Sequence, residues 1–311
     1  MTSLKGWTAA ACVAAWAGFV SLPAAAAEWE LSAGPFTTAS DVTAHNKMPL
    51  DIKEVNDALA SGDWSSALVK FGFGGNFDKH SLARFTDDYN GRLGTHVATA
   101  SKHFGTPSFQ NHALLAALTG SGRFAKASPE ARAAFVDAGL VAVVVNWSRY
   151  ELGESARKAK AGEPNWSLQN GSPKNWNEIF AFYWGPEGKH SAFERVAQAG
   201  GTQVNERLLA ALADGQKDLV AQKWAPEAAE RVAGTLDQAS IVLLSSALEK
   251  AAAADDKERE AARAAAAGYW LAAADALGDD AAVAATVTEA LSGEPDRAKL
   301  KAASESVAPL L

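Results

Sequence analysis

The sequence contains very little sulfur, with one cysteine, Cys12, and two methionines among 311 residues. Cys12 lies inside an N-terminal apolar segment that we expect to be removed, and it lacks the small-residue flanks of a lipoprotein attachment site. The mature chain is therefore predicted to have no disulfide bond, no thiol nucleophile and no metal site built from thiolates.

Common catalytic motifs are also missing. The chain has no G-x-S-x-G, no H-E-x-x-H, no P-loop and no strand followed by G-x-G-x-x-G. A serine-histidine-acid triad needs no proximity in the sequence, but nothing here points to one. We predict that the protein is not an enzyme and that it holds no resident cofactor.

The N-terminus has the pattern of a secretory signal peptide. Lys5 precedes the apolar run 7–22, which ends at Pro23 and the small residues 24–27. A transmembrane anchor is the alternative, but the proline and the alanine run favour a cleaved signal. We predict cleavage near Ala27/Glu28 and a periplasmic or secreted protein.

The mature chain is acidic. Residues 1–27 contain Lys5 and no acid, so their removal leaves 28 basic and 36 acidic residues and a formal charge of −8. Such a surface repels nucleic acid and anionic lipid, and it attracts cations. The acidic charge therefore predicts no nucleic-acid partner. Because no later run of about 18 uncharged apolar residues occurs, we also predict no membrane insertion.

The hydrophobic periodicity predicts an all-α fold of stacked helical hairpins that form one elongated bundle. Residues 28–47 read as an extended leader, and residues 48–311 as the helical domain, with a core over 48–215 and an alanine-rich part over 216–311. The β-branched run 143–145 allows a buried strand, but its alanine-rich flanks favour a buried helix.

A Glu-x-x-Glu pair, Glu151 and Glu154, stands at the end of the longest predicted helix. Residues three apart share a helix face, so both carboxylates could reach one hard cation such as iron or calcium. The alternative is a solvated face on which the two acids pair with Arg149, Arg157 and Lys158, and the spacing alone favours this alternative.

His190 and Glu194 form a second candidate. If a helix opens after Gly188, these residues lie on one face and offer an imidazole and a carboxylate to one metal. The aromatic run 180–184 precedes them and could shield the site from water. We expect the loops near 183–194 and 71–112 to lie close together.

A third group of candidates lies in the loop-rich segment 71–112. Carboxylates and a phenol are oxygen ligands that ferric iron prefers over thiolates, and imidazoles also bind iron. The candidate ligands here are Asp87, Asp88, Tyr89 and His80, with His96, His103 and His112 near them in the sequence.

Tryptophan supplies a different interpretation. Four tryptophans, Trp147, Trp166, Trp176 and Trp184, occur within 38 residues and could form an aromatic face for a flat organic solute. Core packing is the commoner role for such residues.

Several segments resemble the low-iron-inducible periplasmic proteins of green algae, over roughly residues 45–215. The segments that carry the resemblance are Leu50–Ile52, Asp63–Leu68, Phe71–Asn76, Thr106–Phe109 and Asn175–Glu178, the last leading into Ala181–Gly185. A weaker likeness is to imelysin-type periplasmic proteins, whose Gly-x-His-x-x-Glu is similar to residues 188–194 with one extra residue before the glutamate.

The resemblance implies an exported protein of iron uptake, without known catalytic activity, in which Glu-x-x-Glu and His-plus-acid motifs hold iron. We therefore predict extracytoplasmic capture of iron, in its ferric form, as cargo for a separate membrane uptake system. Two alternatives remain: a solute-binding protein with a tryptophan-lined pocket, and a secreted helical scaffold for a protein partner.

Overall fold

The computed structural model describes residues 29–77, 80–88, 90–277 and 280–311. The predicted signal segment and Tyr89 therefore lie outside the described residues.

The prediction of an all-α fold is confirmed, since 72% of the chain is helical. The leader contains a two-stranded antiparallel ladder, in which Ser32 pairs with Thr37 and Ala33 with Phe36, followed by a short 3-10 helix. The elements are β1 (Ser32–Ala33), β2 (Phe36–Thr37), η1 (His45–Lys47), α1 (Met48–Ala60), α2 (Trp64–Phe73), α3 (Leu82–Thr86), α4 (Leu93–His96), α5 (Ala98–Phe104), α6 (Phe109–Thr119), η2 (Gly122–Phe124), α7 (Pro129–Ala159), α8 (Ser172–Trp184), η3 (Pro186–Gly188), α9 (Ala192–Gln198), α10 (Thr202–Val220), α11 (Pro226–Ala253), α12 (Arg259–Ala276), α13 (Ala281–Leu291), α14 (Arg297–Val307) and η4 (Ala308–Leu310).

Helix α7 is the centre of the molecule. It begins where Ser128 accepts a hydrogen bond from the Ala131 amide, with Pro129 in the first turn, a combination that favours a helix start. The run Val143–Val145 is helical and fully buried, as expected. By length and composition α7 could cross a membrane, but 78% of its apolar window is buried inside the protein, as in a core helix.

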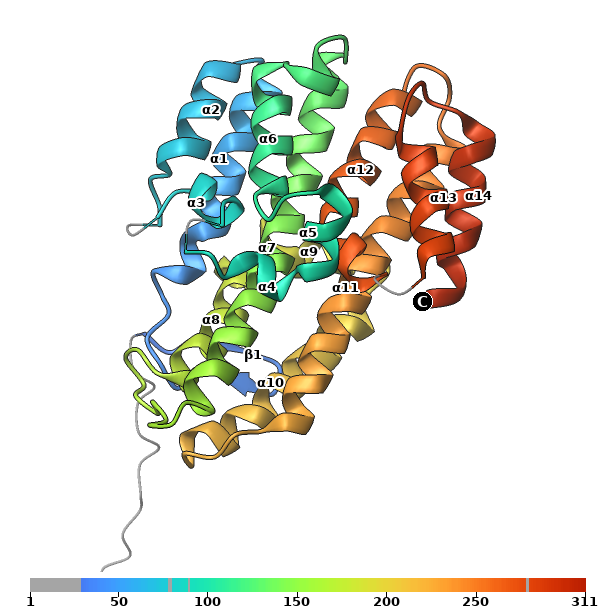
Figure 1. Ribbon diagram of the computed structural model, residues 1–311. Helices are drawn as coiled ribbons and strands as arrows, with labels where there is room; N and C mark the ends of the chain where they lie inside the picture. The colour runs from blue at the N-terminus through green and yellow to red at the C-terminus, as the bar shows by residue number, and fades with distance from the viewer. Residues whose placement is uncertain (1–28, 78–79, 89, 278–279) are drawn as a thin grey trace, which may run out of the picture.

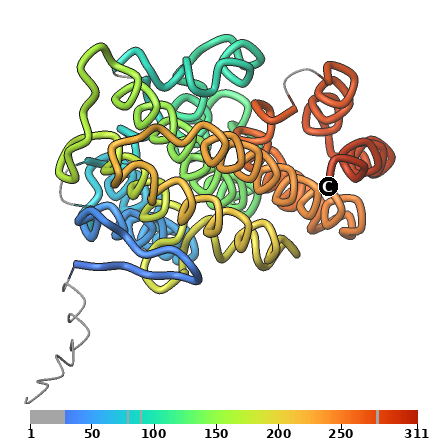
Figure 2. The backbone as a smooth tube through the Cα atoms, turned by 90° about the horizontal axis from the view of Figure 1, so that it is seen from below, coloured from blue at the N-terminus to red at the C-terminus, as the bar shows by residue number. Residues whose placement is uncertain are grey.

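The other helices pack around α7 as antiparallel pairs (Figure 1). Helices α1, α2 and α6 lie beside its first half, and α8 and α10 lie near its second half. Helices α11 and α12 cover another side of α7, and the pair α13 and α14 packs outside them. Viewed from below, this last pair forms the edge of the molecule opposite the N-terminal helices (Figure 2).

The contact between α7 and α12 depends on glycine. A Cβ added at Gly268 would lie 2.7 Å from both the Ala138 Cβ and the Phe135 carbonyl oxygen, closer than real Cβ contacts allow. Because one of these atoms belongs to the backbone of α7, the contact cannot be relieved by a side-chain rotation. Helix α12 can therefore approach α7 this closely only with glycine at position 268.

We expect Gly268→Ala to lower the free energy of unfolding by about 1–3 kcal/mol, the usual cost of overpacking a dense core. Gly234→Ala is the matched control, because position 234 is exposed on α11 and its Cβ would meet nothing within 4 Å. Alanine there should stabilise the helix by about 0.5–1 kcal/mol. Urea unfolding measures both changes, and equal effects would contradict the tight α7–α12 contact.

Candidate functional site

Two buried carboxyl groups meet between α7 and α8. Glu151 on α7 and Glu178 on α8 are only 4% and 8% exposed, and their carboxyl groups are hydrogen-bonded to each other. The Asn175 amide bridges the pair, donating to Glu151 Oε2 and, at 3.3 Å, to Glu178 Oε2. The Trp147 indole N–H donates to Glu151 Oε1 at 2.8 Å. A single hydrogen-bonded unit therefore holds both carboxyl groups away from solvent.

Local helix geometry explains this arrangement. Trp147 and Glu151 are four residues apart on α7, and Asn175 and Glu178 are three apart on α8, so each pair shares a helix face. Since α7 and α8 pack against each other, the two polar faces meet inside the contact.

An imidazole completes the unit. His45 of η1 places Nε2 3.1 Å from Glu178 Oε1, and the Lys174 ammonium lies 3.9 Å from the same oxygen. The other ring nitrogen of His45, Nδ1, is buried without a hydrogen-bond partner. We call Glu151, Glu178 and His45 the carboxylate–imidazole cluster.

Aromatic rings enclose the cluster on its inner side. The His45 ring centroid lies 5.4 Å from that of Phe77 and 5.5 Å from that of Phe182, and Phe85 contacts both phenylalanines and Trp147. Phe77 and Phe85 belong to the segment 71–112, so this segment meets Phe182 of α8. The predicted proximity of this segment to the loop 183–194 stays a prediction. The rings keep water away from the cluster and strengthen its electrostatic interactions.

The two carboxyl groups have opposite pKa shifts. Burial and the charge of Glu178 raise the pKa of Glu151 well above its usual value. Burial alone would also raise the pKa of Glu178, but the hydrogen bond and charge of His45, together with Lys174, lower it overall. Of the two carboxyl groups, Glu178 therefore ionises more readily, and Glu151 keeps its proton to a higher pH.

This proton makes stability depend on pH. The unfolded chain loses the Glu151 proton near the ordinary glutamate pKa, whereas the folded chain keeps it to a higher pH. Glu151 therefore makes its whole contribution to stability at a pH below its pKa in the unfolded chain. This contribution is lost as the pH rises through the pKa of Glu151 in the folded protein. Glu151→Gln cannot ionise, so we expect its free energy of unfolding, relative to the wild type, to improve between pH 4 and pH 8. A pH-independent difference in urea unfolding would disprove the raised pKa.

Glu154, the other member of the Glu-x-x-Glu pair, has different partners. Its carboxylate accepts hydrogen bonds from the Arg157 guanidinium, the shortest 2.8 Å, and lies 3.4 Å from Arg92 Nε and 3.8 Å from His96 Nε2. Burial alone would raise the pKa of Glu154, but the hydrogen bond and charge of Arg157 outweigh it and lower the pKa. The charge of Glu154 is therefore neutralised by Arg157. The alternative interpretation predicted this pairing on a solvated helix face, whereas the Glu154 side chain is buried.

The His190–Glu194 motif does not have the predicted helical geometry. Helix α9 begins at Ala192, so His190 lies before it, in the left-handed region at φ 55° and exposed. The Glu194 carboxylate accepts a hydrogen bond from the His190 backbone N–H at 2.7 Å instead of sharing a helix face with the imidazole. The expectation failed because Glu187 and Gly188, also at positive φ, extend the turn after Gly185.

The acids of the 71–112 segment organise loops. Asp87 accepts a hydrogen bond from the Ser108 hydroxyl, and Asp88 accepts one from the Leu93 amide at 2.6 Å, where α4 begins. His80 lies against the rings of Phe77 and Phe85. Within the described part of the chain, no three histidine, aspartate or glutamate side chains are already arranged around a metal position.

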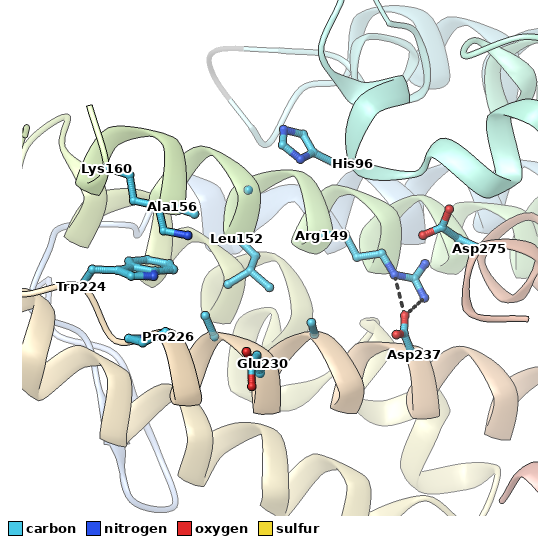
Figure 3. A pocket seen from close by; sticks show the side chains of 13 residues that line it. His96, Arg149, Leu152, Ala156, Lys160, Trp224, Pro226, Glu230, Asp237 and Asp275 are labelled. Carbon is cyan, nitrogen blue, oxygen red and sulfur yellow. Dashed lines mark hydrogen bonds and ion pairs between the residues drawn. The ribbon is translucent and has the colours of Figure 1, made fainter. Parts of the chain in front are cut away.

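A separate groove of about 410 Å³ runs between α7 and α11 (Figure 3). Arg149 stands at one end, where it donates to Asp237 at 2.8 Å, and Lys160 lies 5.2 Å from the centre of the Trp224 ring at the other. None of the four tryptophans predicted to bind a solute lines this groove. Trp147 and Trp176 are core residues, and Trp184 stacks on Phe180.

Sequence reasoning missed His45 and Glu178 as site residues. The i, i+3 spacing of Asn175 and Glu178 at the start of a predicted helix was an available signal, the same one that singled out Glu151. No local signal marked His45, which is an isolated histidine in the leader and reaches Glu178 only through the packing of η1 on α8.

Comparison with known proteins places these residues in a family. A family model described as low iron-inducible periplasmic protein matches residues 9–218, which contain all three members of the carboxylate–imidazole cluster. No curated protein and no solved structure matches the chain. Since the match covers more than half of the sequence, this chain belongs to the family of low iron-inducible periplasmic proteins.

Proposed function

We propose that this protein captures iron outside the cytoplasm and assists its uptake, and that Glu151, Glu178 and His45 are the iron ligands. The observation that carries the proposal is the buried contact between two carboxyl groups beside an imidazole. The family, described as low iron-inducible and periplasmic, supports iron as the cargo.

A cation is the natural replacement for the shared proton. Two carboxylates cannot both ionise in a buried contact unless a positive charge lies between them. Fe³⁺ favours oxygen ligands and also accepts imidazole nitrogen, which is the donor set that the cluster offers. Its charge offsets the cost of ionising both glutamates inside the protein.

Iron has a short route to the cluster. The side chains of His45 and Glu178 are 11% and 10% exposed, whereas Glu151 lies deeper. In the metal-free state these groups bind one another, so iron binding requires loss of the Glu151 proton and a turn of the His45 and Glu178 side chains toward a common centre.

Titration of the mature protein with ferric citrate tests the proposal, using protein without a metal-binding tag. We expect one iron per chain, release of a proton into weakly buffered solution, and an affinity that falls from pH 7.5 to pH 5 as protons compete for Glu151. Absence of stoichiometric iron at pH 7.5 would reject the proposed function. Iron binding without proton release would place the metal elsewhere.

A further inference from the structure

A second cavity, of about 600 Å³, lies at the end of α7 that is farthest from the carboxylate–imidazole cluster. Its walls come from η2, the first turns of α7, α12 and the loop after α13. From Phe135 in this cavity to Glu151 there are sixteen residues of helix, or about 24 Å at 1.5 Å per residue. The cavity is therefore separate from the proposed iron site.

Two arginines share this cavity. The Arg123 guanidinium lies over the rings of Phe124 and Phe135, with its carbon 4.9 Å and 4.7 Å from the ring centres. Arg263 donates to the Leu291 carbonyl oxygen at 2.9 Å, but its Nε is buried and has no hydrogen-bond partner. Arg123 is exposed as a whole residue, but desolvation of its guanidinium by the surrounding protein, together with the charge of Arg263, lowers its pKa.

The acids around the cavity do not neutralise these charges. Burial lowers the pKa of Arg263, and the negative charges of Glu260 and Glu294 only partly oppose this shift. Glu260 also accepts a hydrogen bond from the Ser128 backbone N–H at 3.3 Å. Over the part of the chain that the structure describes, Arg123 forms neither an ion pair nor a side-chain hydrogen bond with the protein. Lys126 adds a third cation to the lining. The lining therefore holds three cationic and two acidic side chains, which gives it a net positive charge. The guanidinium N–H groups of Arg123 have no acceptor in the described protein.

Apolar side chains form the rest of the lining. Ala264, Ala267 and Leu291 lie on the walls beside the charged groups. A cavity with a few charged donors on one side and small apolar residues elsewhere suits a small ligand that has one ionic group and an apolar body.

We propose that this cavity binds a small organic carboxylate. Arg123 and Arg263 hold the carboxylate, since guanidinium groups match its two oxygens in a planar, charge-assisted contact. The apolar body of the ligand lies against Ala264 and Leu291. Because α12 and the loop after α13 lie beyond the matched residues 9–218, this site combines the family region with the C-terminal part of the chain.

Isothermal titration of the full mature chain with three probes tests the proposal. Benzoate carries the charge and an apolar body, benzyl alcohol carries the body alone, and inorganic phosphate carries the charge alone. We expect benzoate to bind at least about tenfold more tightly than either of the other probes. Equal binding of benzyl alcohol would overturn the role of the arginines, and equal binding of phosphate would overturn that of the apolar walls.

Variants locate the binding. Arg123→Gln should weaken benzoate binding at least about tenfold, and Arg263→Gln should do the same. Arg231→Gln removes the same charge from an exposed position on α11, where Arg231 pairs with Asp214, and should leave benzoate binding unchanged. Loss of binding in all three variants, or in none, would contradict the assignment.

A folding defect in the Arg263→Gln variant would leave the Arg123→Gln measurement valid. Arg263→Gln removes the hydrogen bond to Leu291 and could disturb the loop after α13. Arg123 makes no side-chain hydrogen bond to the described protein, so Arg123→Gln should keep the wild-type circular dichroism and melting temperature. Benzoate binding by a folded Arg123→Gln protein at wild-type affinity would by itself overturn the proposal.

Discussion

Glu178→Gln is expected to weaken iron binding by about a hundredfold or more. Glutamine has the size of glutamate but lacks the anionic oxygen that a ferric ion needs. Even mutation of a residue that only hydrogen-bonds to a metal ligand commonly lowers metal affinity about tenfold to a hundredfold. Glu151→Gln should have a similar effect and should also abolish proton release, because we propose that iron displaces the proton of Glu151, whose pKa is raised by burial and by the charge of Glu178. Competition with a chromogenic chelator at pH 7.5 measures both affinities.

Two matched substitutions distinguish this site from the motifs suggested by the sequence. Glu194→Gln alters the acid that caps the His190 backbone N–H, and Glu154→Gln alters the acid held by Arg157. Neither should change iron affinity more than about twofold. If Glu194→Gln abolished iron binding while Glu178→Gln did not, the His190–Glu194 motif would be the iron site and the carboxylate–imidazole cluster would be structural.

Arg149→Ala should be the most destabilising single substitution that we propose. The Arg149 guanidinium is buried and donates to Asp237 on α11, to the Ala272 carbonyl oxygen on α12 and to Asn146 on its own helix. Removing one partner of such a buried network commonly costs about 3–5 kcal/mol, because the remaining polar groups lose their partners. Urea unfolding followed by circular dichroism measures the change.

Arg231→Ala is the control for this measurement. Arg231 pairs with Asp214 at 3.1 Å, but both side chains are at least half exposed, so the pair should contribute under about 1 kcal/mol. A loss of under 1 kcal/mol for Arg149→Ala as well would show that α7, α11 and α12 are held together by apolar packing alone.

Much of the fold could be predicted from periodicity and composition. The helical spacing and the alanine-rich flanks of Val143–Val145 led to an all-α bundle. The loop-rich segment 71–112 does contain the short helices α3, α4 and α5, joined by loops, among its described residues. These features depend on neighbours in the sequence, which is why a pattern can reveal them.

The candidate site could be predicted only in part. Glu151 was singled out by its spacing from Glu154, but the turn of α7 between them gives the two carboxylates different partners. Glu151 meets α8, whereas Glu154 meets Arg92 from the loop before α4. His45 joins Glu178 across more than 130 residues of sequence. Which helix covers which face of α7 is a property of tertiary packing, and no local pattern contains it.

The close packing of α12 on α7 has a consequence for how the family region can exist on its own. The family match ends at residue 218, yet α12 covers the Phe135–Gly139 stretch of α7 so closely that only glycine fits at position 268. A chain cut after residue 218 would keep the whole carboxylate–imidazole cluster but would present a long apolar stripe of its central helix to water. The matched region and the C-terminal helices therefore share one hydrophobic core.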